Sequence, residues 1–211
     1  MTHDFDQGYW EQRWQHAHDT ARANKDTGAP YPYLARETSD LTPGTALDAG
    51  CGSGTEAIWL ASHGWRVTAV DISPSALTRA GERAATAGLS DLVTWVEADL
   101  TEWEPNALFD LVTSGYAHPT MPHLAFYERL SEWVAPGGTL LIVGHLHTPE
   151  ATGHEHHPPA EASVTLTDIV ANIDGATWKI DTSEEHSRTR PGLGGRTIPL
   201  HDVVVRATRR P

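Results

Sequence analysis

The sequence predicts an α/β protein with a seven-stranded, mostly parallel sheet, and three observations lead to this fold class. Short apolar runs alternate with segments of helical periodicity through the middle of the chain. The helical segments begin and end at residues that commonly cap helices. Strands and helices that alternate in this rhythm form parallel sheets through right-handed crossovers, so helices should cover both faces. The last two apolar runs are linked without a helix, which predicts an antiparallel strand at the C-terminal edge.

The first forty residues predict a helical cap ahead of the sheet. Residues 6–25 favour one helix with Asp6 as its N-cap. Tyr9, Trp10 and Trp14 recur with helical spacing, which gives this helix one aromatic face. Residues 26–44 are rich in turn formers and predict a linker with a short helix.

Five strands and three helices are then expected in alternation. The expected strands are residues 45–50, 66–72, 92–99, 109–115 and 139–145. The expected helices are 55–64, ended by Gly64, then 73–88, with Ser73 as N-cap and Gly88 as stop, and 121–138, closed by a Pro-Gly-Gly turn.

The last third of the chain has a different character. A polar, histidine-rich loop at 145–160 is followed by an expected short helix at 165–174. Two strands at 177–188 and 200–209 are joined by a glycine-rich connection, which is the source of the predicted antiparallel edge. The chain therefore divides into a cap (1–40) and one main domain (41–211).

Charge limits the class of partner. The chain has 15 Lys and Arg against 28 Asp and Glu, a formal net charge of −13 with the histidines neutral. Such a surface repels phosphate backbones, and the only basic cluster, residues 206–210, is a short tail. We therefore expect a small-molecule partner and no nucleic acid. The oligomeric state is left open.

Hydropathy and cysteine content predict a cytoplasmic protein. No apolar run is long enough to span a bilayer, and the N-terminus lacks the pattern of a secretory leader. The single cysteine, Cys51, cannot form an internal disulfide, which agrees with a reducing compartment.

The stretch "LDAGCGSG" predicts a ligand-binding loop. Gly50, Gly52 and Gly54 join a strand to a helix, where bare backbone and free amide groups meet a ligand in open parallel sheets. Asp71 ends the next strand and can accept hydrogen bonds from both hydroxyls of a ribose. An alternative role for Asp71 is to cap the helix that follows, although Ser73 is also placed to do so.

Two details separate the possible nucleoside cofactors. A dinucleotide fingerprint would require a glycine where this chain has Thr55. Asp48 precedes the loop, and a carboxylate there would repel a pyrophosphate but would suit an amino group and a positive sulfonium. Asp48 can also fix the loop through its amide groups. Cys51 lies between loop glycines, with no base fixed beside it, and is interpreted as a small packing residue.

The motifs "LDAGCGSG", "VTAVDIS", "VEADL", "FDLVTS" and "LSEWVAPGGTLLIVG" resemble, in order, those of class I S-adenosylmethionine-dependent methyltransferases. This resemblance covers Thr45 to Gly144 and implies a Rossmann-like sheet and S-adenosylmethionine as cofactor. The opening "YWEQRW" resembles the N-terminal helix of the small thiopurine and tellurite methyltransferase-like branch.

The resemblance implies a set of cofactor-binding residues. Asp48 and the loop from Gly50 through Cys51 and Gly52 to Gly54 would serve the methionine portion. Asp71 would hold the ribose. Ile72, Asp99 and Leu100 would meet the adenine, Thr113 and Ser114 would line the floor near the reactive methyl, and Trp10 and Trp14 would close the site. Asp99 can alternatively be an ordinary turn residue, and the two tryptophans the apolar face of a helix packed on the core.

Methyl transfer from a sulfonium requires in-line alignment and exclusion of water more than strong acid–base catalysis. Tyr116 and His118 follow the fourth strand and His145 ends the fifth, so all three are candidates to face the acceptor, with histidine as a base if one is needed. Each histidine can instead be a loop residue with a structural role.

The segment "HEHH" (154–157) resembles a metal-ligand set, but its spacing matches no common zinc pattern, and we predict no metal. The sequence thus predicts an S-adenosylmethionine-dependent methyltransferase acting on a small molecule. The alternatives are a non-catalytic protein that binds S-adenosylmethionine or S-adenosylhomocysteine and, with less support, a nicotinamide-dependent oxidoreductase.

Overall fold

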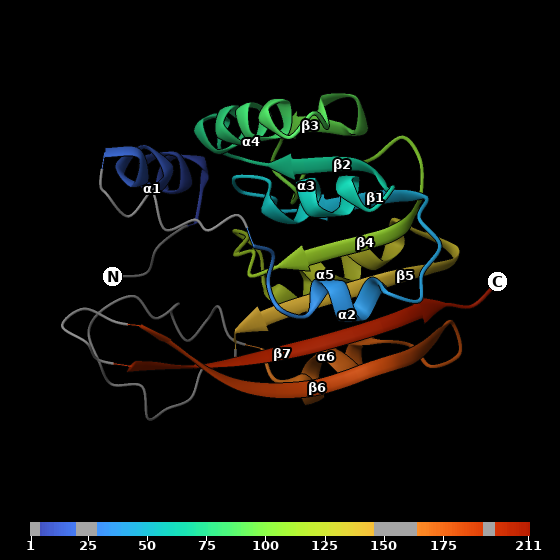
Figure 1. The fold of residues 1–211 in the computed structure, drawn as a ribbon. Coiled ribbons are helices and arrows are strands. Elements are labelled where there is room, and N and C mark those ends of the chain that lie inside the picture. Colours follow the sequence, from blue (N-terminus) through green and yellow to red (C-terminus); the bar gives the residue numbers. More distant parts are fainter. Residues whose placement is uncertain (1–4, 20–28, 146–163, 192–196) are drawn as a thin grey trace.

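A computed structural model describes the chain except for residues 1–4, 20–28, 146–163 and 192–196. It contains one seven-stranded sheet with the strand order β3-β2-β1-β4-β5-β7-β6 (Figure 1). The strands are β1 (Thr45–Ala49), β2 (Arg66–Asp71), β3 (Val93–Glu97), β4 (Phe109–Gly115), β5 (Val134–His145), β6 (Trp178–Pro191) and β7 (Thr197–Arg209). The helices are α1 (Gln7–Asp19), α2 (Leu34–Thr38), α3 (Thr55–Ser62), α4 (Pro74–Thr86), α5 (His123–Glu132) and α6 (Leu166–Asn172), with one 3₁₀ turn, η2 (Ser90–Leu92).

The predicted fold class is confirmed. Strands β1 to β5 are parallel to one another, whereas β7 is antiparallel to both β5 and β6. The antiparallel strand therefore lies one place in from the edge, and β6 forms the edge itself.

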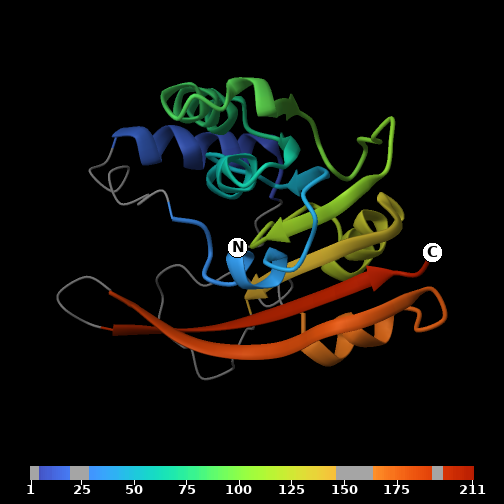
Figure 2. The same cartoon turned by 45° about the vertical axis from the view of Figure 1, so that its right-hand side comes forward.

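Alternating side chains of the strands bury two separate apolar layers. On β1, Ala46 belongs to the cluster that contains Leu34 of α2 and Leu60 of α3. The next residue, Leu47, points to the other face, into the cluster that contains Phe126 of α5 and Ile169 of α6. Helices thus cover both faces of the sheet, and Figure 2 shows these helices from a second angle.

The predicted helix caps agree with the structure. The Asp6 carboxylate accepts a hydrogen bond from the Tyr9 amide at 2.8 Å, and the Ser73 hydroxyl accepts one from the Ala76 amide at 3.2 Å. Gly64 and Gly88 follow α3 and α4 with φ of 92° and 71°, a backbone conformation that glycine adopts without steric cost.

One predicted boundary is wrong. The Pro-Gly-Gly segment, expected to be a turn that closes α5, is part of β5, which begins at Val134. The pairing of β4 with β5 shifts register between Phe109 and Leu111, and Gly137 has a φ of 79°. The strand therefore absorbs the turn residues as an irregularity in its ladder, as a bulge does.

The strand order reverses at β1, because β2 and β3 extend the sheet on one side of β1 whereas β4 and β5 extend it on the other. In open sheets of this kind, ligands bind beyond the carboxyl ends of the strands at such a point. Helix α1 lies beyond these strand ends (Figure 1). Among the described helices, none combines the length and hydrophobicity needed to cross a membrane.

Candidate functional site

A cavity of about 490 Å³ opens at the carboxyl ends of the parallel strands. Its walls come from α1, from the glycine loop after β1, and from the segments that follow β2, β3 and β4. The lining residues are Phe5, Trp10, Trp14, Ala29, Gly50, Cys51, Gly52, Ser53, Thr55, Glu56, Asp71, Ile72, Arg79, Ala98, Asp99, Leu100, Gly115, Tyr116, Ala117, His118, Pro119, Thr120 and Phe126. The structure therefore brings most of the predicted site residues to one place.

The glycine loop admits no side chain at any of its three glycines, and Gly54 is the tightest, with the Trp95 ring 2.4 Å from an added Cβ. Gly50 has a φ of 81°, and a Cβ there would lie 2.7 Å from the Cβ of Ala117. Gly52 has a φ of 51°, and a Cβ there would lie 2.9 Å from the ring of Trp14. The loop is also anchored from α4, because Arg83 donates to the Ser53 carbonyl at 2.8 Å. Bare backbone is therefore held rigidly against the cavity.

Asp71 holds the glycine loop and the start of α4 together. One carboxylate oxygen accepts from the Gly52 amide at 2.8 Å, and the other accepts from the Ser73 amide at 2.9 Å. Burial raises the pKa of this carboxyl, and these amide hydrogen bonds oppose the rise. Both functions predicted for Asp71 are geometrically compatible, because each oxygen keeps a lone pair that can face the cavity.

Asp48 lies beneath the loop and does not line the cavity. Its side chain is buried, and its Oδ2 atom has no hydrogen-bond partner in the described part of the chain. Burial, followed by the charges of Glu56 and Asp71, raises its pKa well above the ordinary value, while a backbone hydrogen bond from Ala57 opposes this. A buried, unpaired carboxylate oxygen beside two other acids suits a cationic ligand group.

Three residues predicted to meet the adenine line the cavity. Ile72 and Leu100 supply apolar surface, and Asp99 directly precedes Leu100. Asp99 also organises its own turn, since its Oδ1 atom accepts from the Thr101 amide at 2.8 Å and from the Thr101 hydroxyl at 2.7 Å. The turn role of Asp99 is confirmed, and its predicted ligand role stays a prediction.

Helix α1 closes the cavity with two tryptophans. Trp14 rests so close to Gly52 that a Cβ at that glycine would touch its ring. The Trp10 indole donates to the carbonyl of His118 at 3.3 Å and lies parallel to the His118 ring, with 6.3 Å between ring centroids. Phe5 stacks on the rings of Trp10 and His118 and completes an aromatic wall.

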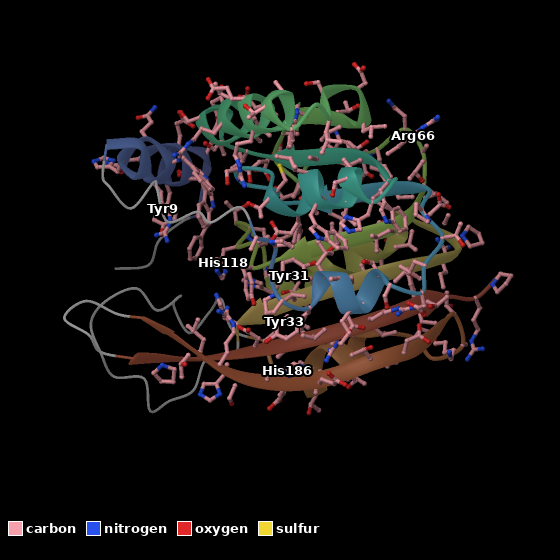
Figure 3. The ribbon with its side chains drawn as sticks, in the orientation of Figure 1. Tyr9, Tyr31, Tyr33, Arg66, His118 and His186 are labelled. Atoms are coloured by element: carbon pink, nitrogen blue, oxygen red, sulfur yellow. The ribbon has the colours of Figure 1, made fainter. Side chains whose placement is uncertain are left out.

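The segment after β4 carries the two predicted acceptor-facing residues that line the cavity, Tyr116 and His118. Burial, followed by the neighbouring His123, lowers the pKa of His118 to about 4, so its imidazole is neutral at physiological pH. The His118 Nδ1 and His123 Nε2 atoms are 3.3 Å apart. Tyr116 has a φ of 56°, a rare conformation for a residue with a side chain, and burial raises the pKa of its hydroxyl. Figure 3 shows His118 and Tyr31 at the end of the molecule where the parallel strands terminate.

Three predicted residues lie behind the cavity wall. His145 stacks on Tyr116 with 4.2 Å between ring centroids, and its Nδ1 atom is 3.1 Å from a carboxylate oxygen of Asp202. Thr113 is buried with its hydroxyl 2.8 Å from that of Tyr31. Ser114 donates to the Ala49 carbonyl at 3.1 Å. Gly54 is likewise not part of the lining.

The predictions for the histidine-rich segment fall outside the described residues. The 154–157 segment and most of the loop predicted at 145–160 belong to the part of the chain whose structure is not described. Within the described ranges, no group of three or more His, Cys, Asp or Glu side chains is placed to hold a metal ion.

Several lining residues were not predicted from the sequence, although their positions follow from the fold; four of them have polar or aromatic side chains that bear on the site. Glu56, in the first turn of α3, accepts from the Tyr31 amide at 3.0 Å and lies near Asp48. Arg79 reaches the cavity from α4, one helical turn before Arg83. Phe5 and Thr120 also belong to the lining. The position of Glu56, two residues after the last loop glycine, is the only sequence signal among these.

Comparison with known proteins agrees with this geometry. A family profile described as a methyltransferase domain matches residues 46–138. Thiocyanate methyltransferase 1 of Brassica oleracea is 28% identical over 193 residues, which cover 89% of this chain and 82% of the relative. A probable thiol methyltransferase 2 of Arabidopsis thaliana is 29% identical over 163 residues, covering 75% of this chain and 69% of the relative.

A solved structure shares the fold along nearly the whole chain. The N-methyltransferase NodS of Bradyrhizobium japonicum, in complex with S-adenosylhomocysteine, aligns with a TM-score of 0.69 at 18% identity, covering 95% of this chain and 98% of that one. These similarities identify a methyltransferase domain of the class I S-adenosylmethionine-dependent type at residues 46–138. Its cofactor is S-adenosylmethionine, as the sequence predicted, and the unpaired Asp48 oxygen, the bare loop and Asp71 fit that molecule.

Proposed function

We propose that this enzyme methylates a small, soft sulfur nucleophile, a thiol or a thiocyanate-like anion, by in-line displacement. The observation that carries this proposal is the acceptor side of the cavity. Its walls are largely aromatic, and its histidine, His118, has a pKa lowered to about 4. Such a weak base suits an acceptor that needs little deprotonation, since a free thiol loses its proton far more readily than an alcohol. The similarity to thiocyanate and thiol methyltransferases supports the same class of acceptor.

The proposed cofactor contacts follow the positions described above. Asp71 holds the ribose hydroxyls, Ile72 and Leu100 enclose the adenine, and Asp99 meets its exocyclic amine. The glycine loop passes beneath the methionine portion with Cys51 as a small packing residue. Asp48, assisted by Glu56, attracts the amino group, which its unpaired oxygen and raised pKa support.

When bound, S-adenosylmethionine supplies a methyl group that is already activated by its positive sulfur. The chain's own residues then have three tasks. Trp10 and Trp14 exclude water from the cavity. Tyr116 and Ala117 set the wall against which the acceptor sulfur approaches the methyl carbon. His118, neutral at physiological pH, offers an imidazole nitrogen that can accept a hydrogen bond from the S–H of a thiol acceptor. His145, Thr113 and Ser114 lie behind this wall and support it.

We also propose a domain division, a location and a size class of acceptor for this protein. Residues 1–40 act as a cap over the cofactor site and residues 41–211 as the methyltransferase domain. The single buried cysteine supports a cytoplasmic location, and the net charge of −13 supports a small acceptor in place of a nucleic acid.

One experiment tests the acceptor class. Purified protein is incubated with S-adenosylmethionine and, separately, thiocyanate, hydrosulfide, a small aromatic thiol, a primary amine and a carboxylic acid, and S-adenosylhomocysteine is quantified. We expect turnover with the sulfur acceptors and little with the amine or the acid. Turnover confined to the amine or the acid would contradict the proposal, and cofactor binding without turnover on any acceptor would favour a non-catalytic role.

A further inference from the structure

We infer that Glu11 is a positioning residue that couples the docking of α1 to the hold of Asp71 on the cofactor. The inference rests on the cofactor role proposed for Asp71. It concerns a residue of α1 that lies within the YWEQRW stretch but is not among the site residues predicted from the sequence.

Glu11 binds the first turn of α4 from across the cavity mouth. Its Oε2 atom accepts from the Ser73 hydroxyl at 2.6 Å and from the Ser75 amide at 3.1 Å, and its Oε1 atom accepts from the Ser75 hydroxyl. Gln15, one turn further along α1, donates to the same carboxylate at 2.8 Å. The carboxylate therefore accepts from three donors at the start of α4 and from one on its own helix, and this contact ties α1 to the sheet domain.

The electrostatics of this contact favour a charged carboxylate. Helix α4 has 13 residues, and the amide groups of its first turn carry partial positive charge. The hydrogen bonds from Ser73 and Ser75 lower the pKa of Glu11 to about 2. Glu11 therefore remains ionised throughout the physiological range and keeps the stronger, charge-assisted form of each hydrogen bond.

The contact is shared with the cofactor site through Ser73. The Ser73 hydroxyl donates to Glu11, while its backbone amide donates to Asp71 at 2.9 Å. The other Asp71 oxygen accepts from Gly52, and Gly52 is in turn covered by Trp14 of α1. Because Glu11 and Trp14 are three residues apart, they lie on neighbouring positions of one helical face. Contacts thus run from α1 through Ser73, Asp71 and Gly52 back to α1.

Because these contacts begin and end on α1, docking of α1 and binding of the cofactor are thermodynamically linked. A ligand that fixes Asp71 and the glycine loop also fixes both surfaces on which α1 docks. By linkage, docking of α1 must strengthen cofactor binding by the same factor by which the cofactor strengthens docking. Removal of the Glu11 carboxylate should therefore weaken cofactor binding although the side chain lies outside the lining of the cavity.

The test measures binding of S-adenosylhomocysteine to the full chain, without any acceptor. We expect Glu11→Ala and Glu11→Gln to weaken binding in calorimetry about five- to tenfold, mainly through faster dissociation in stopped-flow measurements. Glu82→Gln removes an equally charged side chain from an exposed position of α4 and should leave both quantities unchanged. Unaltered affinity and dissociation rate in both Glu11 variants would overturn the inference.

A double-mutant cycle tests whether Glu11 affects cofactor binding through Asp71 or only by holding α1 over the cavity. If Glu11 acts through Asp71, the combined Glu11→Ala and Asp71→Ala variant should lose less affinity than the sum of the single losses. Hydrogen exchange supplies a second reading, since S-adenosylhomocysteine should protect the amides of α1 in the wild type and fail to do so in Asp71→Ala. Additive losses would overturn the coupling. Unchanged affinity in Asp71→Ala alone would instead overturn the cofactor role proposed for Asp71.

Discussion

The two halves of the cavity are built in different ways. The half proposed to bind the cofactor comes from one continuous stretch, from Asp48 to Leu100, and offers backbone amides and carboxylates. The half proposed to face the acceptor is assembled from distant segments, with Trp10 from α1 and Tyr116 and His118 after β4. One half is therefore specified by local motifs and the other by tertiary packing. We expect substitutions in one half to change cofactor affinity and substitutions in the other to change the KM for the acceptor.

The acceptor half also depends on a buried ionic cluster behind the cavity wall. Arg188 of β6 donates to the Tyr116 hydroxyl at 3.2 Å and forms an ion pair with Asp202 of β7. Asp202 also accepts from the Tyr33 hydroxyl at 2.9 Å and pairs with His145. Burial disfavours its ionisation, but these hydrogen bonds hold the pKa of Asp202 well below its ordinary value. The cluster fixes the strained Tyr116 in place from behind.

The largest expected effect is on the cofactor half. Asp71→Ala should weaken S-adenosylhomocysteine binding at least tenfold, on the order of 1.4 kcal/mol, because charge-assisted hydrogen bonds to the ribose and the tie to Gly52 are lost together. Calorimetric titration measures this. An unchanged affinity would mean that the cofactor lies elsewhere.

A glycine substitution tests the contact between α1 and the loop. Gly52→Ala places a Cβ 2.9 Å from the Trp14 ring in a backbone with positive φ, and should weaken cofactor binding several-fold. Gly81→Ala is the matched control, because Gly81 lies in α4 with no atom within 4 Å of its added Cβ. The control should retain affinity and stabilise the fold by about 0.5–1 kcal/mol in denaturant unfolding. Equal affinities of the two variants would contradict the role of the loop as a tight surface beneath α1.

The ionic cluster should affect only the acceptor half. Arg188→Gln and Tyr116→Phe each remove the hydrogen bond between these side chains, and should raise the KM for the acceptor a few-fold, as expected for loss of roughly 1 kcal/mol of positioning. S-adenosylhomocysteine affinity should stay at the wild-type value. A change in cofactor affinity with no change in acceptor KM would reverse the assignment of the two halves.

The pH dependence should be small around neutrality. With the pKa of His118 lowered to about 4, its imidazole is already neutral above that value and loses its function only as pH falls toward 4. The rate with thiocyanate, which carries no titrating thiol, should therefore show no inflection from His118 near 6.5. Such an inflection in the wild type that disappears in His118→Gln would show that the imidazole is not shielded as described.

The smallest expected effect is that of chelators. Activity should survive prolonged treatment with metal chelators, because methyl transfer from a sulfonium needs no Lewis acid and the 154–157 spacing matches no common zinc pattern. Loss of activity that zinc or iron restores would assign a metal to that segment.

The difference between the two halves also explains which features could be predicted. The fold, the glycine loop and the cavity positions of Asp71 and Asp99 follow from local patterns, because a strand, a turn and a helix in succession place them. His145 could not be placed in this way. It pairs across the sheet with Asp202, 57 residues later, and only the antiparallel register of β5 and β7 brings the two together. The prediction for the Pro-Gly-Gly segment was wrong because β4 pairs on both sides of it, with Val134 and again from Thr139, so the strand continues through the segment as an irregularity.

The C-terminal hairpin gives the molecule a separable means of changing its acceptor. Arg188 and Asp202 lie on its two strands, and both act on Tyr116 without touching the loop that follows β1. Exchange of this hairpin between related enzymes can therefore reshape the acceptor wall while cofactor recognition is inherited intact. Sequence changes in this hairpin, in evolution or in laboratory recombination, should therefore alter acceptor preference while cofactor binding is kept.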